Sequence, residues 1–232
     1  MASFGASHTS AGACGALDIA PMIAFGIAVT DQTQYERCAA AGIAQVAVPE
    51  DLVMTRGGLT LQRAYNAMLD EVSARHDLEA VVLLHQDMRI MSSDFRERIR
   101  AILADRTVGL VGVSGAIGST GLAWWDGAAP VGAFGTDVGG RISTVGVPLG
   151  DREQAGADAV DGTLLVLPAW TARQVHFDLG FERDFHGYDT DIAFQVRELG
   201  GRVVVANLWC IHERMGKIGA RRGAWVRAVA EV

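Results

Sequence analysis

Apolar residues in this chain gather in short continuous runs, and these runs alternate with segments of mixed polarity. The clearest run is 80–84, with five apolar residues in a row, which is typical of a strand buried on both faces of a parallel sheet. In residues 60–73 apolar side chains recur every three or four positions, which predicts a helix with one buried face. Further strands are expected at 22–29, 45–48, 108–113, 160–167 and 202–206, and further helices at 33–41, 94–103, 169–175 and 191–199.

The order of these elements predicts the fold class. Up to residue 113 strands and helices alternate, which implies an α/β protein with a parallel sheet and helices on both faces. The following segment, 115–158, is rich in glycine and carries Trp124 and Trp125 in a loop. We therefore expect a nucleotide-binding half at 19–113 and an irregular half at 114–212 that faces a second substrate.

The strand at 80–84 is followed directly by His85, Gln86 and Asp87. Strands of a parallel sheet deliver ligand groups at their carboxyl ends, and in an extended backbone residues two apart point to the same side. His85 and Asp87 could thus form half of a site for a divalent cation that holds a phosphate. In the alternative, Asp87 caps the following helix and His85 is a packed residue at the strand end. The triplet alone leaves both interpretations open.

Charge is distributed unevenly over the 232 residues. The net charge is −7, but residues 202–232 hold six basic residues against two acidic ones, so this segment is +4 and the remainder is −11. An acidic body argues against a nucleic-acid-binding protein. A basic segment near a carboxylate site would suit a bound diphosphate, although a solvated basic tail is the common alternative.

Targeting and redox signals are sparse. Residues 1–18 contain no basic residue and lack the apolar middle of a signal peptide, so we expect a loose tail. The apolar stretch at 19–29 is too short to span a bilayer. The three cysteines are widely spaced and form no CxxC pair, which suits a reducing cytoplasm. Half of the residues are hydrophobic, enough for one large core, and a single domain is expected over 19–232.

Several short motifs, taken in order, resemble glycosyltransferase family 2 with its GT-A fold, and are most similar to the streptomycin-biosynthesis-type glycosyltransferase-like domains. The resemblance extends from about Met22 to His212 and implies a three-layer sandwich with a mostly parallel central sheet. The motifs are Ala64-Tyr65-Asn66-Ala67, Leu84-His85-Gln86-Asp87, Val160-Asp161-Gly162, Phe185-His186-Gly187-Tyr188-Asp189-Thr190-Asp191, and His212 after the last sheet strand.

The resemblance implies a metal site and a donor site. Asp87 falls in the Asp-x-Asp motif of the family and would ligate Mn²⁺ or Mg²⁺ on a nucleotide-sugar diphosphate, and His212 would complete the metal shell. His85 replaces the first acid of that motif. The residues assigned to the donor are His85, Glu50 and Asp51 for the base and ribose side, and Asn66 in the first motif. Apart from the resemblance, the glycines among the charges after His212 suggest a basic lid at 213–232, whose Lys217, Arg221 and Arg222 would reach the phosphates.

The resemblance also implies catalytic and acceptor residues. Asp189 corresponds to the general base of inverting members, and Tyr188 replaces the glutamate before it. Sugar transfer needs such a carboxylate to deprotonate the acceptor hydroxyl, and a neutralised leaving diphosphate. An ordinary helix cap would also place acid here, and we assign the cap or a structural role to Asp191. The residues assigned to the acceptor or its sugar are Trp124, Trp125, Asp161 and His186.

These expectations define three hypotheses. The first is an inverting, metal-dependent glycosyltransferase that uses a UDP-sugar and a sugar, natural-product or peptide acceptor. The second is a non-catalytic module that binds a nucleotide or glycan, which the replacements at His85 and Tyr188 support. The third is a nucleotidyltransferase, but the first strand ends without the expected glycine-rich basic loop. A homo-oligomer is left open.

Overall fold

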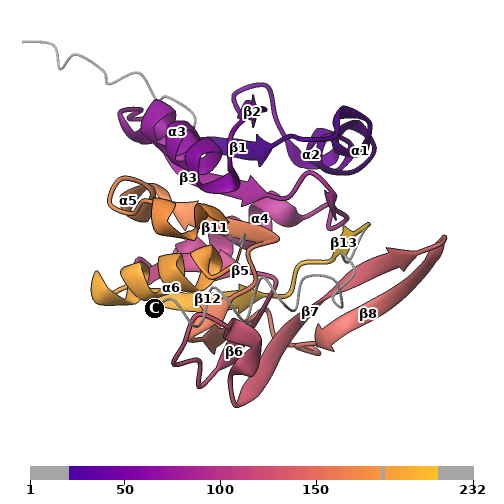
Figure 1. Cartoon of the computed structure of the whole chain (residues 1–232), viewed down its shortest axis with the longest axis vertical. Coiled ribbons are helices and arrows are strands. Elements are labelled where there is room, and N and C mark those ends of the chain that lie inside the picture. Colours follow the sequence, from indigo (N-terminus) through magenta and orange to yellow (C-terminus); the bar gives the residue numbers. More distant parts are fainter. Residues whose placement is uncertain (1–20, 184–185, 214–232) are drawn as a thin grey trace, which may run out of the picture.

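The computed structural model describes residues 21–183 and 186–213, and it contains a large mixed sheet flanked by helices (Figure 1). The main sheet has seven strands in the order β2-β1-β3-β11-β5-β12-β9. Five of them run in one direction, while β11 and β9 run against their neighbours. The strands are β1 (Met22–Ala28), β2 (Leu52–Arg56), β3 (Leu78–Leu84), β5 (Val108–Gly112), β9 (Gln154–Ala157), β11 (Leu164–Pro168) and β12 (Arg202–Ala206).

A second sheet lies beside the carboxyl ends of the main strands. Its order is β10-β6-β7-β13-β4, and β8 pairs with β7 in a hairpin that projects from the body (Figure 1). Most of its strands come from the glycine-rich part of the chain. Its strands are β4 (Met88–Ile90), β6 (Ser114–Ile117), β7 (Ala129–Val138), β8 (Arg141–Val147), β10 (Ala159–Val160) and β13 (Cys210–His212).

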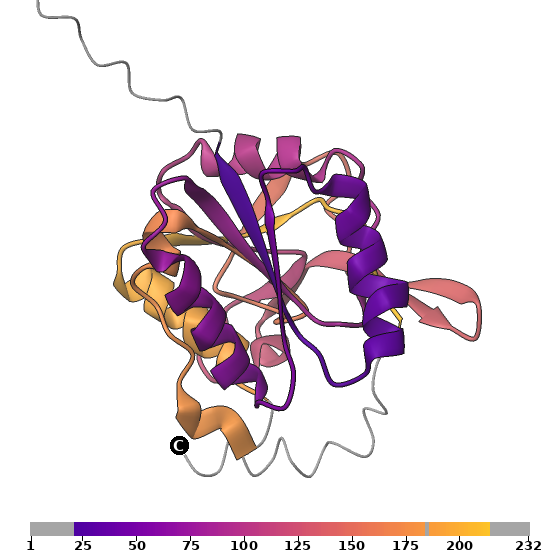
Figure 2. The same ribbon diagram turned by 90° about the horizontal axis from the view of Figure 1, so that it is seen from above.

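Helices cover both faces of the main sheet, which makes three layers (Figure 2). One face carries α3 (Leu61–Ser73), α5 (Ala169–Ala172) and α6 (Tyr188–Glu198). The opposite face carries α4 (Phe95–Leu103) and the helical run of α1 (Gln32–Tyr35), a π-helix η1 (Glu36–Ala40) and α2 (Ala41–Val46). Short 3₁₀ helices, η2 (Trp124–Asp126) and η3 (Leu179–Arg183), lie in the second half of the chain.

Strand β3 shows why the sequence folds this way. Val81 and Leu83 join the core under α3, whereas Val82 and Leu84 join the core on the opposite face. Residues 80–84 are all fully buried, so the prediction of a strand covered on both faces is confirmed. Burying a side chain of this size contributes about 1.5–3 kcal/mol, and the strand end is consequently held firmly in place.

The predicted strand at 45–48 is wrong, because Ile43 and Val46 pack on the sheet from helix α2. The helical run continues to Val46, past residue 41, where the predicted helix ended. A Cβ atom at Gly42 would lie 2.5 Å from the backbone nitrogen of Ile90, so this glycine permits close packing of the helix on β4. The second strand is β2, and Glu50 and Asp51 precede it instead of following a strand.

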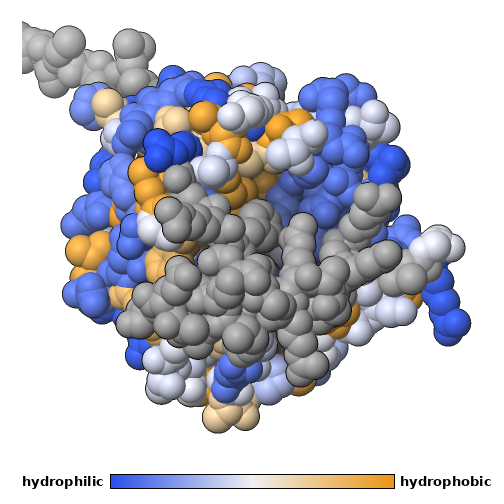
Figure 3. All heavy atoms as spheres, viewed as in Figure 1, coloured by the Kyte–Doolittle hydropathy of each residue, from blue (hydrophilic) through white to orange (hydrophobic). Residues whose placement is uncertain are grey.

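Where Figure 3 shows described residues, their surface is mainly hydrophilic, with an apolar group near the upper middle of the view. Among the described residues, no helix is long and apolar enough to cross a membrane. The cysteines at 38 and 210 are buried and unpaired. The N-terminal tail at 1–18 and the basic residues Lys217, Arg221 and Arg222 of the predicted lid lie outside the described residues.

Candidate active site

The turn between β3 and β4 carries His85 and Asp87. The backbone N–H of His85 donates to the carbonyl of Thr163 at 3.0 Å, and that of Met88 donates to the carbonyl of His85 at 3.0 Å. Strand β4 follows at once, and α4 begins only at Phe95. Asp87 therefore does not cap a helix, and that alternative is wrong.

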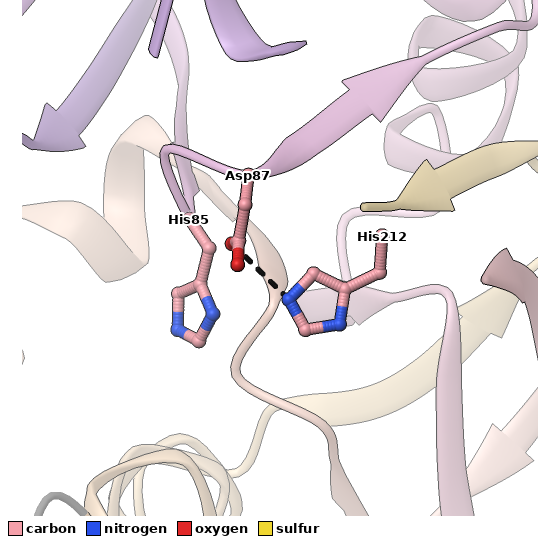
Figure 4. Close-up of side chains that lie close together, drawn as sticks. All are labelled: His85, Asp87 and His212. Atoms are coloured by element: carbon pink, nitrogen blue, oxygen red, sulfur yellow. Dashed lines mark ion pairs between the residues drawn. The ribbon is translucent and has the colours of Figure 1, made fainter. Parts of the chain in front are cut away.

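His212 reaches this turn from a distant part of the chain. Strand β13 pairs antiparallel with β4, with His212 opposite Met88, so the histidine lies next to Asp87. The distance between His212 Nε2 and Asp87 Oδ1 is 3.1 Å (Figure 4). One ligand atom from each of His85, Asp87 and His212 lies within 4.8 Å of the other two. The structure thus brings together the three residues that the sequence assigned to one end of the sheet.

The electrostatics of this cluster favour a cation. Burial acts to raise the pKa of Asp87, but the hydrogen bond with His212 and the neighbouring imidazoles outweigh it and hold this pKa below its ordinary value. Asp87 is therefore a carboxylate at neutral pH. The Nδ1 atom of His212 is buried and has no hydrogen-bond partner among the described residues. Two imidazoles and one carboxylate in one cluster are a donor set that fits a divalent transition metal.

A hydrogen bond joins the cluster to helix α6. His85 Nε2 lies 2.8 Å from the hydroxyl oxygen of Tyr188, the first residue of that helix. The Tyr188 side chain is buried, and burial, followed by the charge of Asp189, raises its pKa well above the ordinary value. The hydroxyl is consequently neutral at any physiological pH.

Asp189 lies in the first turn of α6 and is also buried. Its Oδ2 accepts a hydrogen bond from the Gly162 N–H at 3.0 Å, and its Oδ1 accepts one from the Thr190 N–H at 2.9 Å. Burial, followed by the charge of Asp161, raises the pKa of Asp189 to about 7. A carboxyl group with this pKa is suited to proton transfer near neutral pH.

The N-cap of α6 is Gly187, whose φ of 88° lies in the left-handed region that glycine adopts readily. Neither Asp189 nor Asp191 takes the cap position. Asp191 instead accepts a hydrogen bond from Gln195 Nε2 at 2.7 Å. Of the two roles predicted for Asp191, the cap is therefore wrong, and the side chain makes a structural contact within the helix. The physical reason is that the helix begins three residues earlier than the apolar pattern indicated.

Three aromatic side chains meet near the start of α6. The ring centroids of Trp124 and Trp125 are 5.8 Å apart, and those of Trp125 and His186 are 5.9 Å apart, both with the rings nearly perpendicular. Trp124 packs partly against the core, whereas Trp125 is 43% exposed. The Thr190 hydroxyl donates to the carbonyl of Leu122 at 3.0 Å and so connects this loop to the helix that carries Asp189.

Asp51 and Glu50 lie at the other end of the sheet. The Asp51 carboxylate pairs with Arg96 and accepts a hydrogen bond from the Ile23 N–H at 3.0 Å, and its side chain is only 1% exposed. Ile23 is near the amino end of β1. A strand of about seven residues spans roughly 20 Å, so Asp51 is well removed from Asp87. The structure does not bring Glu50 or Asp51 to the cluster.

Asn66 is also engaged elsewhere. Its side-chain amide donates to the carbonyl of Phe177 at 2.9 Å, and its Oδ1 accepts from the Phe177 N–H at 2.8 Å. Both hydrogen-bonding ends of this side chain therefore hold the segment that follows α5 against α3. Asp161, by contrast, lies beside Asp189, although its own Oδ1 accepts from the Thr163 N–H at 2.8 Å.

Gln86 is a structural residue that sequence reasoning treated only as a spacer. Its Oε1 accepts from the backbone N–H groups of Thr30 and Asp31 at 2.7 and 3.0 Å, and its amide donates to Gln34 Oε1 at 3.0 Å. Gln86 thus connects the loop after β1 to the turn that holds Asp87. Only its position between His85 and Asp87 could have signalled this role.

Sequence reasoning also missed the contacts of the residue next to His212. Glu213 follows His212 directly, and its Oε1 accepts a hydrogen bond from Arg37 Nε at 2.7 Å. The Cys38 thiol donates to Glu213 Oε2 at 3.1 Å. Arg37 and Cys38 belong to the π-helix η1, so this helix holds the end of β13 and helps to place His212.

Comparison with known proteins identifies the class. A family model described as "Glycosyltransferase like family" matches residues 24–222, and the chain belongs to this family. The predicted resemblance is thereby confirmed. A relative from Streptomyces griseus, "Streptomycin biosynthesis protein StrF", is 32% identical over 188 residues, which are 81% of this chain and 64% of that protein. The chain therefore spans somewhat less than two thirds of the relative's length.

Two solved structures share the fold. GalNAc-T7 with UDP, GalNAc and Mn²⁺ has a TM-score of 0.56 at 10% identity, over 85% of this chain and 44% of that one. The mannosyltransferase PcManGT from Pyrobaculum calidifontis, in complex with GDP-Man and Mn²⁺, has a TM-score of 0.54 at 15% identity, over 94% and 68% of the two chains. The predicted GT-A-like α/β fold is confirmed by these neighbours and by the flanked central sheet.

Proposed function

We propose that this protein is an inverting, metal-dependent glycosyltransferase that transfers a sugar from a nucleotide-sugar to an acceptor hydroxyl. The observation that carries the proposal is the cluster of His85, Asp87 and His212 at the carboxyl end of β3. The buried Asp189 lies on the adjoining helix, next to Tyr188, which contacts His85. The fold neighbours that hold Mn²⁺ with UDP or with GDP-Man support this choice of cofactor and donor class.

The cluster would hold the cation. When bound, a divalent metal neutralises the charge that develops on the leaving diphosphate. Asp87 would supply the anionic ligand, and the two imidazoles would supply neutral nitrogen ligands. Magnesium prefers an all-oxygen shell, whereas imidazole suits transition metals. Of the two ions that the sequence suggested, the donor set therefore favours Mn²⁺ over Mg²⁺.

Asp189 would act as the general base. In an inverting transfer the acceptor oxygen attacks the anomeric carbon, the bond from that carbon to the diphosphate oxygen breaks, and the acceptor proton moves to a carboxylate. The two backbone N–H donors orient the Asp189 carboxylate. Its raised pKa makes it a stronger base than an exposed aspartate.

Trp125 and His186 would form the platform for the acceptor or the transferred sugar. An indole presents a flat apolar face with a polar N–H at its edge, which suits the C–H face of a sugar ring. Trp125 is exposed and lies against His186, close in sequence to Asp189. Asp161 would complete this side of the site through its position beside Asp189.

The decisive experiment measures binding and turnover separately. UDP and GDP are titrated with and without Mn²⁺ by calorimetry, and a panel of UDP- and GDP-sugars is then assayed for release of the nucleotide. We expect Mn²⁺-dependent binding of one nucleotide and slow hydrolysis of its sugar derivative. Binding without any turnover would favour the non-catalytic module. Absence of metal-dependent nucleotide binding would overturn the proposal.

A further inference from the structure

Tyr188 and His85 connect two elements that are far apart in the chain. Tyr188 begins α6 and His85 ends the buried run of β3, and their polar atoms are 2.8 Å apart. The proposed metal site therefore has a direct contact with the helix that carries Asp189. This contact has a consequence for how the His85 ring can bind a metal.

The position of the Tyr188 hydroxyl is fixed by its surroundings. The ring packs against Phe177, with 5.9 Å between the centroids. On another side it lies against Gly162, where a Cβ atom would come within 2.2 Å of the Tyr188 hydroxyl oxygen. Tyr188 as a whole is only 3% exposed. The hydroxyl is thus held in place by packing, independently of its contact with His85.

The Tyr188 hydroxyl contacts His85 at Nε2, so the nitrogen of His85 that can ligate a metal is Nδ1. Figure 4 shows the other side of the ring, with Nδ1, turned toward Asp87 and His212. Ligation through Nδ1 requires the ring proton to reside on Nε2. An oxygen at 2.8 Å can accept that proton in a hydrogen bond, and the Tyr188 hydroxyl supplies such an oxygen.

We infer that Tyr188 is a positioning residue, which holds His85 in the tautomer and orientation that present Nδ1 to a divalent transition metal. This inference rests on the proposed metal site and adds to it a residue that contacts no substrate. Partners of this kind, which hydrogen-bond to a ligating histidine, typically alter metal affinity by 10- to 100-fold when removed.

The first experiment measures Mn²⁺ affinity by calorimetry in the absence of any nucleotide. In Tyr188→Phe the ring and its packing remain and only the hydroxyl is lost, so we expect the dissociation constant for Mn²⁺ to rise about 10- to 100-fold. Tyr65→Phe is the matched control. Tyr65 is fully buried, and its hydroxyl has no hydrogen-bond partner in the part of the chain that the structure describes, so its removal should leave Mn²⁺ affinity unchanged.

The second experiment shows whether Tyr188 acts through His85. His85→Ala alone should weaken Mn²⁺ binding, and adding Tyr188→Phe to that variant should weaken it no further. Thermal unfolding of each metal-free variant shows whether the fold persists. Unchanged affinity in folded Tyr188→Phe, or an equal loss with and without His85, would overturn the inference while the metal site stands. A wild-type protein that binds no Mn²⁺ would overturn both.

Discussion

The Asp189 carboxylate accepts a hydrogen bond from the backbone N–H of Gly162 at 3.0 Å, across 27 residues of sequence. The bond connects the first turn of α6 to the turn between β10 and β11. Glycine is required at 162, because any side chain would collide with the Tyr188 ring. One turn therefore orients Asp189 and makes room for Tyr188, and this shared support underlies the predictions for both residues.

Asp189→Asn is expected to retain donor affinity and to lose turnover. An amide cannot accept the proton of an acceptor hydroxyl, so transfer should fall by about 10²- to 10⁴-fold, the usual contribution of general-base catalysis. Turnover with saturating donor and Mn²⁺ is the measurement, with donor binding by calorimetry as its control. Turnover close to that of the wild type would assign the base elsewhere, with Asp161 as the next candidate.

The raised pKa of Asp189 also predicts how stability depends on pH. The folded state holds this proton up to about pH 7, whereas the unfolded chain releases it near the ordinary value of 3.8. The stabilisation of the folded state by the protonated Asp189 carboxyl is therefore fully present below about pH 4 and is lost as the pH rises through 7. At 1.36 kcal/mol per pKa unit the loss is about 4 kcal/mol.

Urea unfolding between pH 5 and pH 8 measures this effect in the metal-free protein. Wild-type stability should fall relative to Asp189→Asn as the pH rises, because the amide does not titrate. The amide also loses one of the two backbone hydrogen bonds, but that loss is the same at every pH. A constant difference between the two proteins over this range would contradict the assigned pKa.

Asp87→Ala is expected to abolish Mn²⁺-dependent nucleotide binding while the fold survives. The carboxylate is the only anionic member of the cluster, and none of the helices that the structure describes uses its side chain as a cap. Asp94→Ala is a suitable control, since Asp94 is half-exposed and pairs with Arg98 on α4. Calorimetry of UDP and GDP with Mn²⁺ tests the variant, and unchanged binding would remove Asp87 from the metal site.

The buried pair of Arg96 and Asp51 predicts a structural role at the far end of the sheet. Both side chains are at most 9% exposed, so Arg96→Met would leave a buried carboxylate without its cation. Breaking such a pair costs about 3–5 kcal/mol, which urea unfolding would detect. Nucleotide affinity should stay unchanged in the folded variant and in Asp51→Asn. A selective loss of nucleotide affinity in Asp51→Asn would instead restore the donor role that the family resemblance implied.

Trp125→Ala is expected to raise the KM for the acceptor several-fold and to leave donor affinity unchanged. Stacking of an aromatic ring contributes on the order of 0.5–1.5 kcal/mol beyond burial, and Trp125 is exposed enough to offer it. Trp125→Phe keeps a ring in place and should lose less. Equal KM values for the wild type and the alanine variant would show that the acceptor binds elsewhere.

The sequence alone was sufficient to predict the elements whose hydrophobic pattern is strong. The five apolar residues at 80–84 are all buried only if both faces of the strand are covered, and the helix at 61–73 has one continuous apolar face. The order of motifs then indicated the family and placed His85, Asp87 and His212 at one end of the sheet. Local pattern and motif order are properties of the chain itself, so they needed no knowledge of packing.

Other features depended on contacts between distant segments. The run at 45–48 is too short for its hydrophobic pattern to distinguish a strand from a helix. The packing of this part of the chain on the sheet favours the helix. Asp51 looked like a donor ligand because a strand was expected before it. Its carboxylate instead pairs with Arg96, which is 45 residues away in the sequence.

The position of the 161–163 turn also depends on distant contacts, because β11 enters the sheet between β3 and β5 and so places this turn beside α6. The contact of His85 with Tyr188 spans 103 residues. Such pairs form only when the chain closes on itself, so only the tertiary structure could decide them.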